Sequence, residues 1–251
     1  MSAYEGSSGK KRKKRRKSRP FLWLLIFILI IAGAVMVLRS SLFNVTSILV
    51  EGNKYYTPSQ VIELSGIETG KNLIFDVRTR AAKNRLLDSP YIITAKIEKV
   101  PMGTVIIKID ERIEYAAAFD GEKYVIIDRE GTVLRITDTE PEITILEGME
   151  IAEAEEGKPL KVQQTYMLTG TLKILAATEE MDLYFKKVYF SSAVVRAYIY
   201  DKYYCEGTPD GILSNLKPIK ELVTSHYMQD INKGVIKVGT GGELFFDPKI
   251  D

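Results

Sequence analysis

Two side chains in this sequence could form a nucleophilic pair. Cys205 and His226 are the only cysteine and the only histidine among 251 residues. A thiol that is activated by a nearby imidazole is the nucleophile of cysteine-dependent transpeptidases. The neighbours of the cysteine, Tyr204 and Glu206, carry no positive charge that would lower the pKa of the thiol. We therefore expect Cys205 to be a small buried residue of a strand, and His226 to lie near the C-terminus of a helix.

A membrane-anchored transpeptidase of the sortase type is the enzymatic alternative, with Cys205 as nucleophile and His226 as its partner. That class places the histidine before the cysteine in the chain and an arginine after the cysteine. Here the cysteine comes first, so the order of the two residues is reversed. The sequence favours the structural interpretation of both residues.

The other motifs that could bind a ligand are incomplete. Gly239, Gly241 and Gly242 could surround a phosphate, but no predicted helix follows them, and a hairpin turn is the simpler interpretation. The acidic residues between positions 147 and 156 lack the ligand spacing and central glycine of a calcium loop. We predict no catalytic residue, cofactor, metal or small-molecule substrate, and we expect the chain to bind other proteins.

An uncharged stretch of 18 residues, 21–38, determines on which side of a membrane the rest of the chain is expected to lie. As a helix it would be about 27 Å long, which is close to the thickness of the hydrocarbon core of a bilayer. Nine of the ten residues 10–19 are basic, and Arg39 is the only charge just after the stretch. This asymmetry predicts a single span with a cytoplasmic N-terminus. Trp23, Leu29 and Ile30 are the expected anchor residues.

A cleaved signal peptide is the alternative for this segment. Its apolar run is longer than the usual core of a signal peptide, and its small residues lie within the run instead of after it.

The charges of the chain are divided between its two ends. Residues 1–20 carry nine basic side chains and one acidic side chain, so their net charge is +8, which leaves −6 for the rest of the chain. We expect a disordered cytoplasmic tail that contacts the anionic inner leaflet. The acidic exterior argues against binding to nucleic acid.

Residues 43–112 have the pattern of one compact α/β unit. A strand is expected over 43–53, and its alternation slips between Val45 and Ile48, which suggests a bulge. A helix is expected to begin after Thr57, with a capping box closed by Gln60, and to end at Gly66. The connection that follows has Leu73 and Phe75 to bury, and a second helix is expected over 79–87.

Two strands complete this unit, at 91–100 and 104–111, joined by a hairpin turn. Val105, Ile107 and Ile109 face one side of the second strand and should form the core. The resulting order of elements is β-α-α-β-β.

This order resembles the POTRA domain, and the residues resemble the FtsQ/DivIB family of bacterial cell-division proteins. That family usually has a proline two residues after its Glu-Arg pair, where this chain has Glu114, but the following alanine is retained. The resemblance is carried by Phe43, Val45, Ile48, Val50, Gly52 and Asn53, then by Ser89, Pro90, Tyr91, Ile92, Ala95 and Ile97, and then by Val100, Pro101, Glu111 and Arg112.

Residues 113–248 have the pattern of a second, β-rich domain with two helices, followed by a short C-terminal tail at 249–251. Strands are expected at 115–119, 124–128, 133–137, 143–146, 184–191, 194–200, 203–206, 234–238 and 243–247. Helices are expected over 161–181 and from Ser214, as N-cap, to residue 227, while 149–158 is expected to be a loop. The fold class is therefore α+β, with one transmembrane helix.

The resemblance implies a non-enzymatic scaffold of the divisome, which helps to assemble and regulate septal peptidoglycan synthesis. It implies partners of the DivIC/FtsB and FtsL types and concentration at the septum. A different class, a POTRA module for protein translocation or envelope sensing, stays open. We predict that the partner binds along the last strand, at Glu243, Leu244, Phe245 and Phe246, because a terminal strand often has a free edge.

Overall fold

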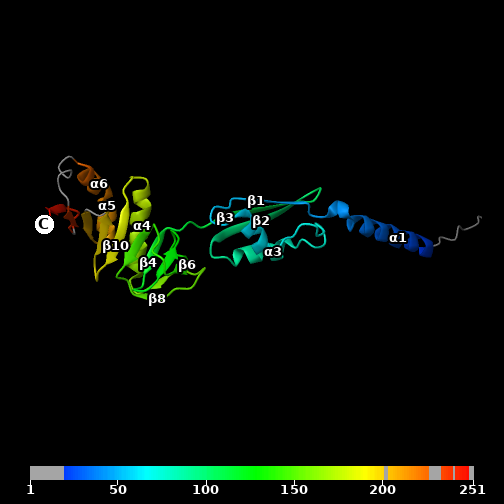
Figure 1. Cartoon of the computed structure of the whole chain (residues 1–251), viewed down its shortest axis with the longest axis horizontal. Coiled ribbons are helices and arrows are strands. Elements are labelled where there is room, and N and C mark those ends of the chain that lie inside the picture. Colours follow the sequence, from blue (N-terminus) through cyan, green and yellow to red (C-terminus); the bar gives the residue numbers. More distant parts are fainter. Residues whose placement is uncertain (1–19, 201–202, 226–232, 240, 249–251) are drawn as a thin grey trace, which may run out of the picture.

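The computed structural model describes residues 20–200, 203–225, 233–239 and 241–248. The elements follow one another along a single axis, with a long helix at one end, a small sheet in the middle and a large sheet at the other end (Figure 1). The basic tail and residues 249–251, like His226, lie outside the described residues.

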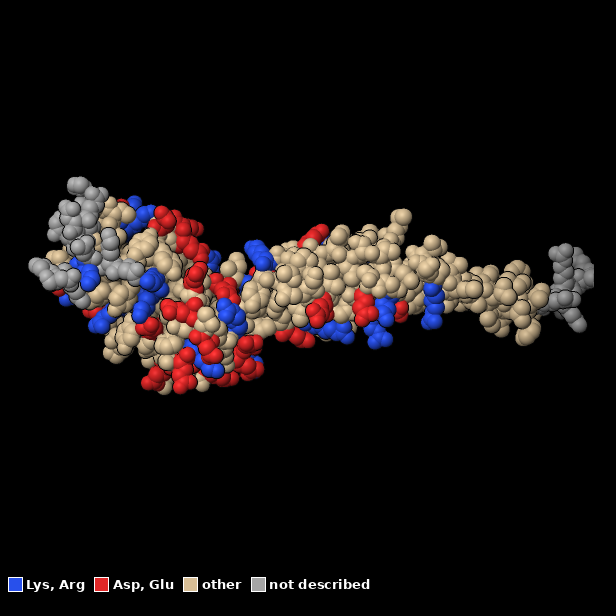
Figure 2. Space-filling view, in the orientation of Figure 1, with Lys and Arg blue, Asp and Glu red and all other residues tan. Residues whose placement is uncertain are grey.

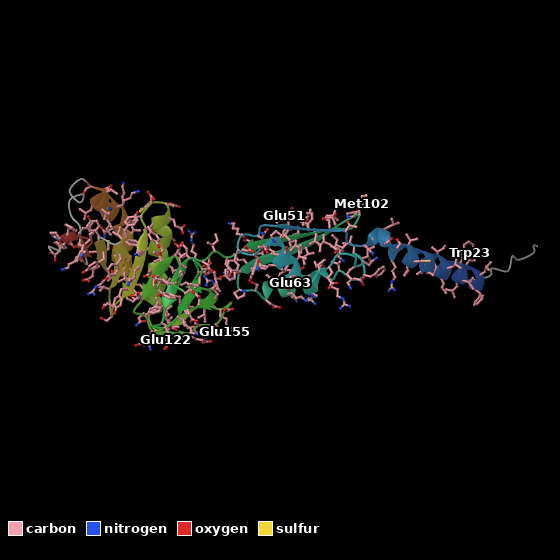
Figure 3. All side chains as sticks on the ribbon, in the orientation of Figure 1. Trp23, Glu51, Glu63, Met102, Glu122 and Glu155 are labelled. Atoms are coloured by element: carbon pink, nitrogen blue, oxygen red, sulfur yellow. The ribbon has the colours of Figure 1, made fainter. Side chains whose placement is uncertain are left out.

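Helix α1, Pro20–Leu38, contains no buried residue. Its mean hydropathy is 3.1 over an 18-residue window, so by length and composition it could cross a membrane. Pro20 suits the first position of a helix, where its missing N–H has no partner to lose. Trp23 lies toward the N-terminal end of α1, away from the sheets (Figure 3), and its side chain is exposed, as are those of Leu29 and Ile30.

The predicted order β-α-α-β-β is confirmed after this helix. The central strand of the small sheet is β3, which pairs in parallel with β1 and antiparallel with β2. The elements are a short 3-10 helix η1, Ser41–Phe43; β1, Ser47–Glu51; α2, Pro58–Ser65; α3, Thr79–Leu87; β2, Ile92–Val100; and β3, Thr104–Glu111.

Local sequence signals place α2 as expected. The Thr57 hydroxyl accepts a hydrogen bond from the Gln60 backbone N–H, and the Gln60 side chain accepts one from the Thr57 N–H. Gly66 ends the helix at φ = 64°, a conformation that glycine adopts without strain. The helices cover one face of the sheet, where Val105, Ile107 and Ile109 are buried.

Two expectations for this domain are wrong. The first strand begins at Ser47 instead of 43 and pairs without a bulge, because the segment before it bonds elsewhere. Val45 donates its N–H to the Lys71 carbonyl and accepts from the Gly70 N–H, each at 2.8 Å. Leu73 is buried as expected, but Phe75 is 41% exposed.

The second domain is built on one nine-stranded mixed sheet. Its order is β14-β13-β12-β11-β10-β7-β4-β5-β6, so β14 and β6 are the two edges. Neighbouring strands are antiparallel except for β4 with β7, β7 with β10, and β12 with β13, which are parallel. The strands are β4, Ala116–Phe119; β5, Tyr124–Ile127; β6, Val133–Thr137; β7, Thr144–Glu147; β10, Phe185–Phe190; β11, Val195–Ile199; β12, Tyr203–Gly207; β13, Gly234–Val238; and β14, Leu244–Pro248.

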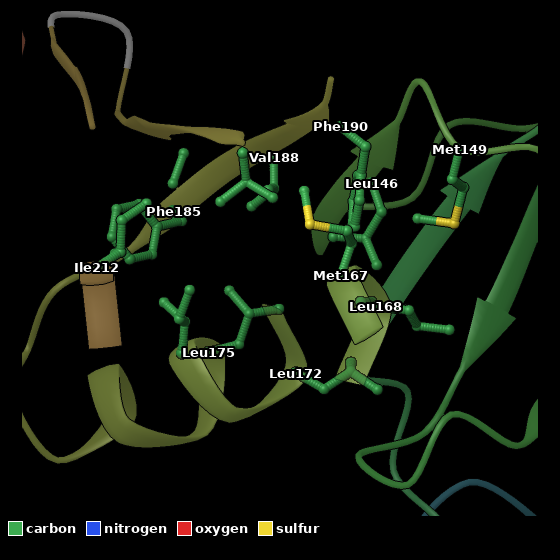
Figure 4. Packing of buried hydrophobic residues seen from close by; sticks show 14 of the residues in the cluster. Leu146, Met149, Met167, Leu168, Leu172, Leu175, Phe185, Val188, Phe190 and Ile212 are labelled. Carbon is green, nitrogen blue, oxygen red and sulfur yellow. The ribbon is translucent and has the colours of Figure 1, made fainter. Parts of the chain in front are cut away.

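Three helices pack against one face of this sheet: α4, Thr165–Glu179; α5, Pro209–Ser214; and α6, Leu216–Thr224. In Figure 4 the α4 side chains Leu172 and Leu175 lie beneath strand residues such as Val188. Phe185, which is almost fully buried, lies near Ile212 of α5 in the same core (Figure 4).

The structure corrects three details of the second domain. Helix α5 is additional to the two expected helices, with Thr208 as its N-cap and Pro209 at its first position. The cap of the following helix is Asn215 and not Ser214. Within the stretch expected to be a loop, β8, Ile151–Glu153, pairs with β9, Lys161–Val162, so α4 begins at Thr165.

Candidate protein-interaction surface

Strand β14 forms one edge of the nine-stranded sheet. Its register with β13 joins Ile236 to Phe246 and Val238 to Leu244. In the described part of the chain no strand pairs with the other side of β14. We call this outer side, together with the preceding Glu243, the β14 edge.

The hairpin turn determines which backbone groups point outward at the β14 edge. The Gly239 N–H donates to the Glu243 carbonyl at 2.8 Å, so these two residues form a hydrogen-bonded pair. Hydrogen-bonded and non-hydrogen-bonded pairs alternate along an antiparallel ladder. Leu244 and Phe246 therefore direct their N–H and C=O groups outward, while Pro248 has no N–H to offer. A backbone of another chain could add to this edge as a further strand.

The two phenylalanines of β14 lie on opposite faces. Phe246 packs against the core, and its ring lies over Gly234, where an added Cβ would approach within 2.5 Å of the ring. Phe245 is 60% exposed. The four predicted partner-binding residues are thus contiguous on an exposed edge, with one aromatic side chain fixed and one accessible; their role in binding stays a prediction.

The sheet face on the Phe245 side carries polar and aromatic side chains. The rings of Tyr198 and Tyr204 have their centroids 5.2 Å apart. Arg196 and Glu206 form an ion pair at 2.6 Å across β11 and β12. Lys237 lies 3.8 Å from Asp247, next to Phe245. A strand added at the β14 edge would therefore lie beside both polar and aromatic side chains.

Cys205 is the small buried strand residue that the sequence suggested. It is fully buried in β12, and burial raises the pKa of its thiol to about 12. A thiol in that position stays protonated at neutral pH and out of reach of a substrate. The residues that the structure describes contain no group of three potential metal ligands.

Residues 111–114 connect the two domains through an array of charged side chains. The Glu111 carboxylate accepts hydrogen bonds from the backbone N–H groups of residues 54–56, at 2.6, 2.6 and 3.3 Å. Arg112 donates to the Asp128 carboxylate at 2.5 Å. These contacts fix the start of the segment between β3 and β4, and the Arg112–Asp128 pair ties it to the large domain.

Glu114 bridges the two domains within this array. Its carboxylate accepts from the Tyr91 hydroxyl of the small domain at 2.6 Å, and from Arg135 of the large domain at 2.7 and 3.1 Å. The Tyr91 ring stacks on Tyr55 with centroids 3.7 Å apart. Burial disfavours the charge on Glu114, but the hydrogen bonds from Arg135 and Tyr91 outweigh it and lower the pKa of this carboxyl. We name Glu114, Tyr91 and Arg135 the interdomain bridge.

Replacing Glu114 by alanine should loosen the two domains relative to each other. The Tyr91 hydroxyl and the Arg135 guanidinium would lose their shared acceptor, and a partly buried donor without a partner costs about 1–3 kcal/mol. Spin labels on Glu51→Cys and Glu122→Cys, which lie in different domains (Figure 3), would report the distance distribution by electron–electron resonance. We expect a broader distribution in the Glu114→Ala variant.

Glu130→Gln serves as the control for the bridge, because Glu130 is exposed and lies 3.8 Å from Arg112. An unchanged distance distribution in Glu114→Ala would show that the other contacts of residues 111–114 hold the two domains together without the bridge.

The low pKa of the Glu114 carboxyl also gives the interdomain bridge a pH dependence. The bridge is present when Glu114 is ionised, and it is lost as the pH falls through the lowered pKa of this carboxyl.

Comparison with known proteins identifies relatives of both domains. Residues 43–112 match the family model described as a POTRA domain of the FtsQ type. The chain is 29% identical over 209 residues to the cell division protein DivIB of Clostridium acetobutylicum, which covers 82% of this chain and 83% of that protein.

Two further relatives extend this similarity. Cell division protein DivIB of Clostridium botulinum is 25% identical over 251 aligned residues, which cover 94% of this chain and 93% of that protein. Cell division protein FtsQ of Corynebacterium glutamicum is 28% identical over 182 residues, which cover 63% of this chain and 78% of that protein. The similarity thus extends through the large sheet as well as the POTRA domain.

Proposed function

Because the chain belongs to the FtsQ/DivIB family of bacterial cell-division proteins, we propose that it is a non-enzymatic scaffold of the divisome. In this role it gathers and regulates the proteins that synthesise septal peptidoglycan. The observation that carries the proposal is the β14 edge, which offers outward backbone groups at the end of the molecule farthest from α1 (Figure 1). A scaffold acts by such contacts and requires no reactive side chain.

The proposed topology follows from the charges at the two ends of α1. Residues 21–38 span the cell membrane once, with the basic tail in the cytoplasm against the anionic inner leaflet. The POTRA domain at 43–112 and the β domain at 113–248 lie outside the cytoplasm, and the protein concentrates at the division septum. The mildly acidic exterior argues against binding to nucleic acid.

The proposed partners are two small bitopic division proteins, of the DivIC/FtsB and FtsL types. The extracytoplasmic segment of the DivIC/FtsB-type partner adds a strand to the β14 edge. Backbone hydrogen bonds to Leu244 supply affinity, and Phe245 together with the neighbouring Tyr198–Tyr204 face supplies specificity.

Leu244→Pro tests the β14 edge directly. Its N–H points outward, so proline removes one hydrogen bond to the partner without removing one to β13. The loss of this bond and the bulk of the ring at the interface should weaken binding about tenfold, which corresponds to about 1.4 kcal/mol. Titration of the partner's extracytoplasmic segment onto the full-length protein in detergent measures the effect.

Leu244→Ala is the matched control, because it shortens the same side chain but keeps the backbone donor. It should bind more tightly than the proline variant. Equal affinities of a folded Leu244→Pro variant and the wild type would move the site elsewhere, most plausibly to the tyrosine-bearing face of β11 and β12.

Localisation tests the proposed function as a whole. A fluorescent fusion of the full chain should concentrate at midcell, and the detergent-solubilised chain should co-purify with division proteins. A uniform distribution around the cell would favour a POTRA module that serves translocation or envelope sensing.

A further inference from the structure

The C-terminal end of α1 is fastened to a loop of the POTRA domain. The Asn72 side-chain amide donates a hydrogen bond to the Leu38 carbonyl, one of the free carbonyls at the helix end, at 2.9 Å. The Arg39 guanidinium lies over the Phe75 ring, 5.3 Å from its centroid. The Leu73 N–H donates to the Phe43 carbonyl at 2.7 Å. The POTRA domain therefore begins where the helix ends, without a free linker.

The loop that contacts the helix is itself held rigidly. The Asn72 side-chain oxygen accepts from the N–H groups of Ile74 and Phe75 at 3.0 and 3.1 Å, and Asp76 accepts from the Asn72 N–H at 2.9 Å. Asn72 is 8% exposed, so a polar side chain is buried here with its amide and carbonyl both in use. Ile74 and Phe75 are thus presented in a fixed position.

Large apolar side chains are exposed at this same end of the domain. Leu42 is 77% exposed and Met102 is 89% exposed, while Ile74 and Phe75 are each about two-fifths exposed. Met102 lies at the tip of the β2–β3 hairpin, which reaches toward α1 (Figure 3). We call these four residues the apolar end. They come from three separate segments, the one after α1, the loop and the hairpin, that the fold brings to one side.

The lipid surface is the partner that best fits the apolar end. Leu42 follows the last residue of α1 by four positions, so the apolar end lies at the level where the helix leaves the hydrocarbon core. In Figure 2 the upper side of the molecule is free of Lys, Arg, Asp and Glu from α1 onto the adjoining end of the POTRA domain, whereas charged side chains lie along the lower side of that end. Arg39 and Lys71, both cations that suit lipid phosphates, come from the segments beside it.

We propose that the apolar end seats the POTRA domain on the outer leaflet of the membrane that α1 spans, with Leu42, Phe75 and Met102 inserted at the level of the headgroups. Apolar side chains on the rim of a membrane anchor bind the interface by burying their surface there. The proposal rests on the proposed membrane span. Its consequence is a fixed orientation, in which the long axis of the protein stands on the membrane and the β14 edge points away from it (Figure 1).

Cysteine labelling in vesicles tests this seat with the full chain. Cys205 is buried and its thiol stays protonated. A thiol-reactive fluorophore therefore labels an engineered surface cysteine and leaves Cys205 unmodified. Met102→Cys and Leu42→Cys are the test positions, and both native side chains are exposed. The proteins are reconstituted into phosphatidylcholine–phosphatidylglycerol vesicles that contain lipids with a nitroxide near the headgroup.

Glu63→Cys, on the side of the same POTRA domain, and Glu122→Cys, on the large sheet, are the matched controls (Figure 3). We expect a blue shift of the fluorophore and quenching by nitroxide lipid at positions 102 and 42, and neither effect at the two controls. Quenching at 102 and 42 no stronger than at the controls would overturn the seat. A blue shift without lipid quenching would also overturn it, since protein would then cover the apolar end.

The fluorescence of Trp23 distinguishes a failure of the apolar end to contact lipid from a failure of α1 to insert into the membrane. It is the only tryptophan of the chain and lies within α1, so nitroxide lipids should quench its fluorescence if the helix is inserted. Quenched Trp23 with unquenched labels at 102 and 42 would refute the seat and leave the span intact. An unquenched Trp23 would refute the span and, with it, the seat.

Discussion

Replacing Ile107 by aspartate is expected to unfold the POTRA domain while the large sheet keeps its structure. Ile107 is fully buried in β3, the central strand of the small sheet. A carboxylate placed there loses its water and gains no partner, and mutations that bury such a charge can cost more than about 4 kcal/mol. A domain of about 70 residues has a stability of about 0.05–0.15 kcal/mol per residue, so the loss approaches its whole stability.

Hydrogen exchange with mass spectrometry on the full-length protein in detergent would locate the effect. Peptides from residues 43–112 should exchange at the rate of an unfolded chain, while peptides from β10 to β12 stay protected. The two domains have separate hydrophobic cores, which is why the unfolding should be local.

Ile93→Asp makes the same chemical change at a side chain of β2 that is 43% exposed. Its carboxylate stays hydrated, so protection of the POTRA domain should persist in this variant. Full protection in Ile107→Asp as well would mean that the inward face of β3 has been assigned wrongly.

The parts of the fold that the sequence predicted are those with local causes. The Thr57–Gln60 capping box and Gly66 act within one short helix, and both act as expected. The alternation of Val105, Ile107 and Ile109 identifies the buried face of β3 without knowledge of its neighbours. In these places every signal lies within a few residues of the element that it specifies.

The errors occur where a distant segment decides the structure. Val45 has the pattern of a strand residue, but its backbone bonds to residues 70 and 71, which no local pattern shows. Gly170 lies in the middle of α4, where a glycine costs about 1 kcal/mol relative to alanine, yet a Cβ there would lie 2.5 Å from Pro209 of α5. The glycine permits two helices to approach each other, so its reason is long-range packing. For α5 the Thr208–Pro209 start signal was present and could have identified the helix.

The candidate sites divide in the same way. The last strand and the opposite faces of Phe245 and Phe246 follow from alternation, whereas the outward direction of the Leu244 backbone depends on the hydrogen bond between Gly239 and Glu243. Glu114 looked only like a departure from a family pattern. Its partners Tyr91 and Arg135 are 23 and 21 residues away along the chain, so its bridging role required the tertiary structure.

Arginine at both Leu29 and Ile30 is expected to prevent insertion of α1. The two positions lie at the middle of the 19-residue helix, which would be at the centre of the hydrocarbon core of the bilayer. Each arginine at a helix centre costs about 2.5–3.5 kcal/mol on the insertion scale, so the pair costs about 5–7 kcal/mol. Alkaline extraction of membranes should release the double variant and leave the wild type in the membrane fraction.

Exchanging the two residues, Leu29→Ile with Ile30→Leu, keeps the apolar character and should insert normally. Protease added to intact spheroplasts should then digest residues after 40 and spare the basic tail in both the wild type and this control. Protection of the large C-terminal part would reverse the proposed topology. It would place the β14 edge in the cytoplasm and remove the basis for an extracytoplasmic partner.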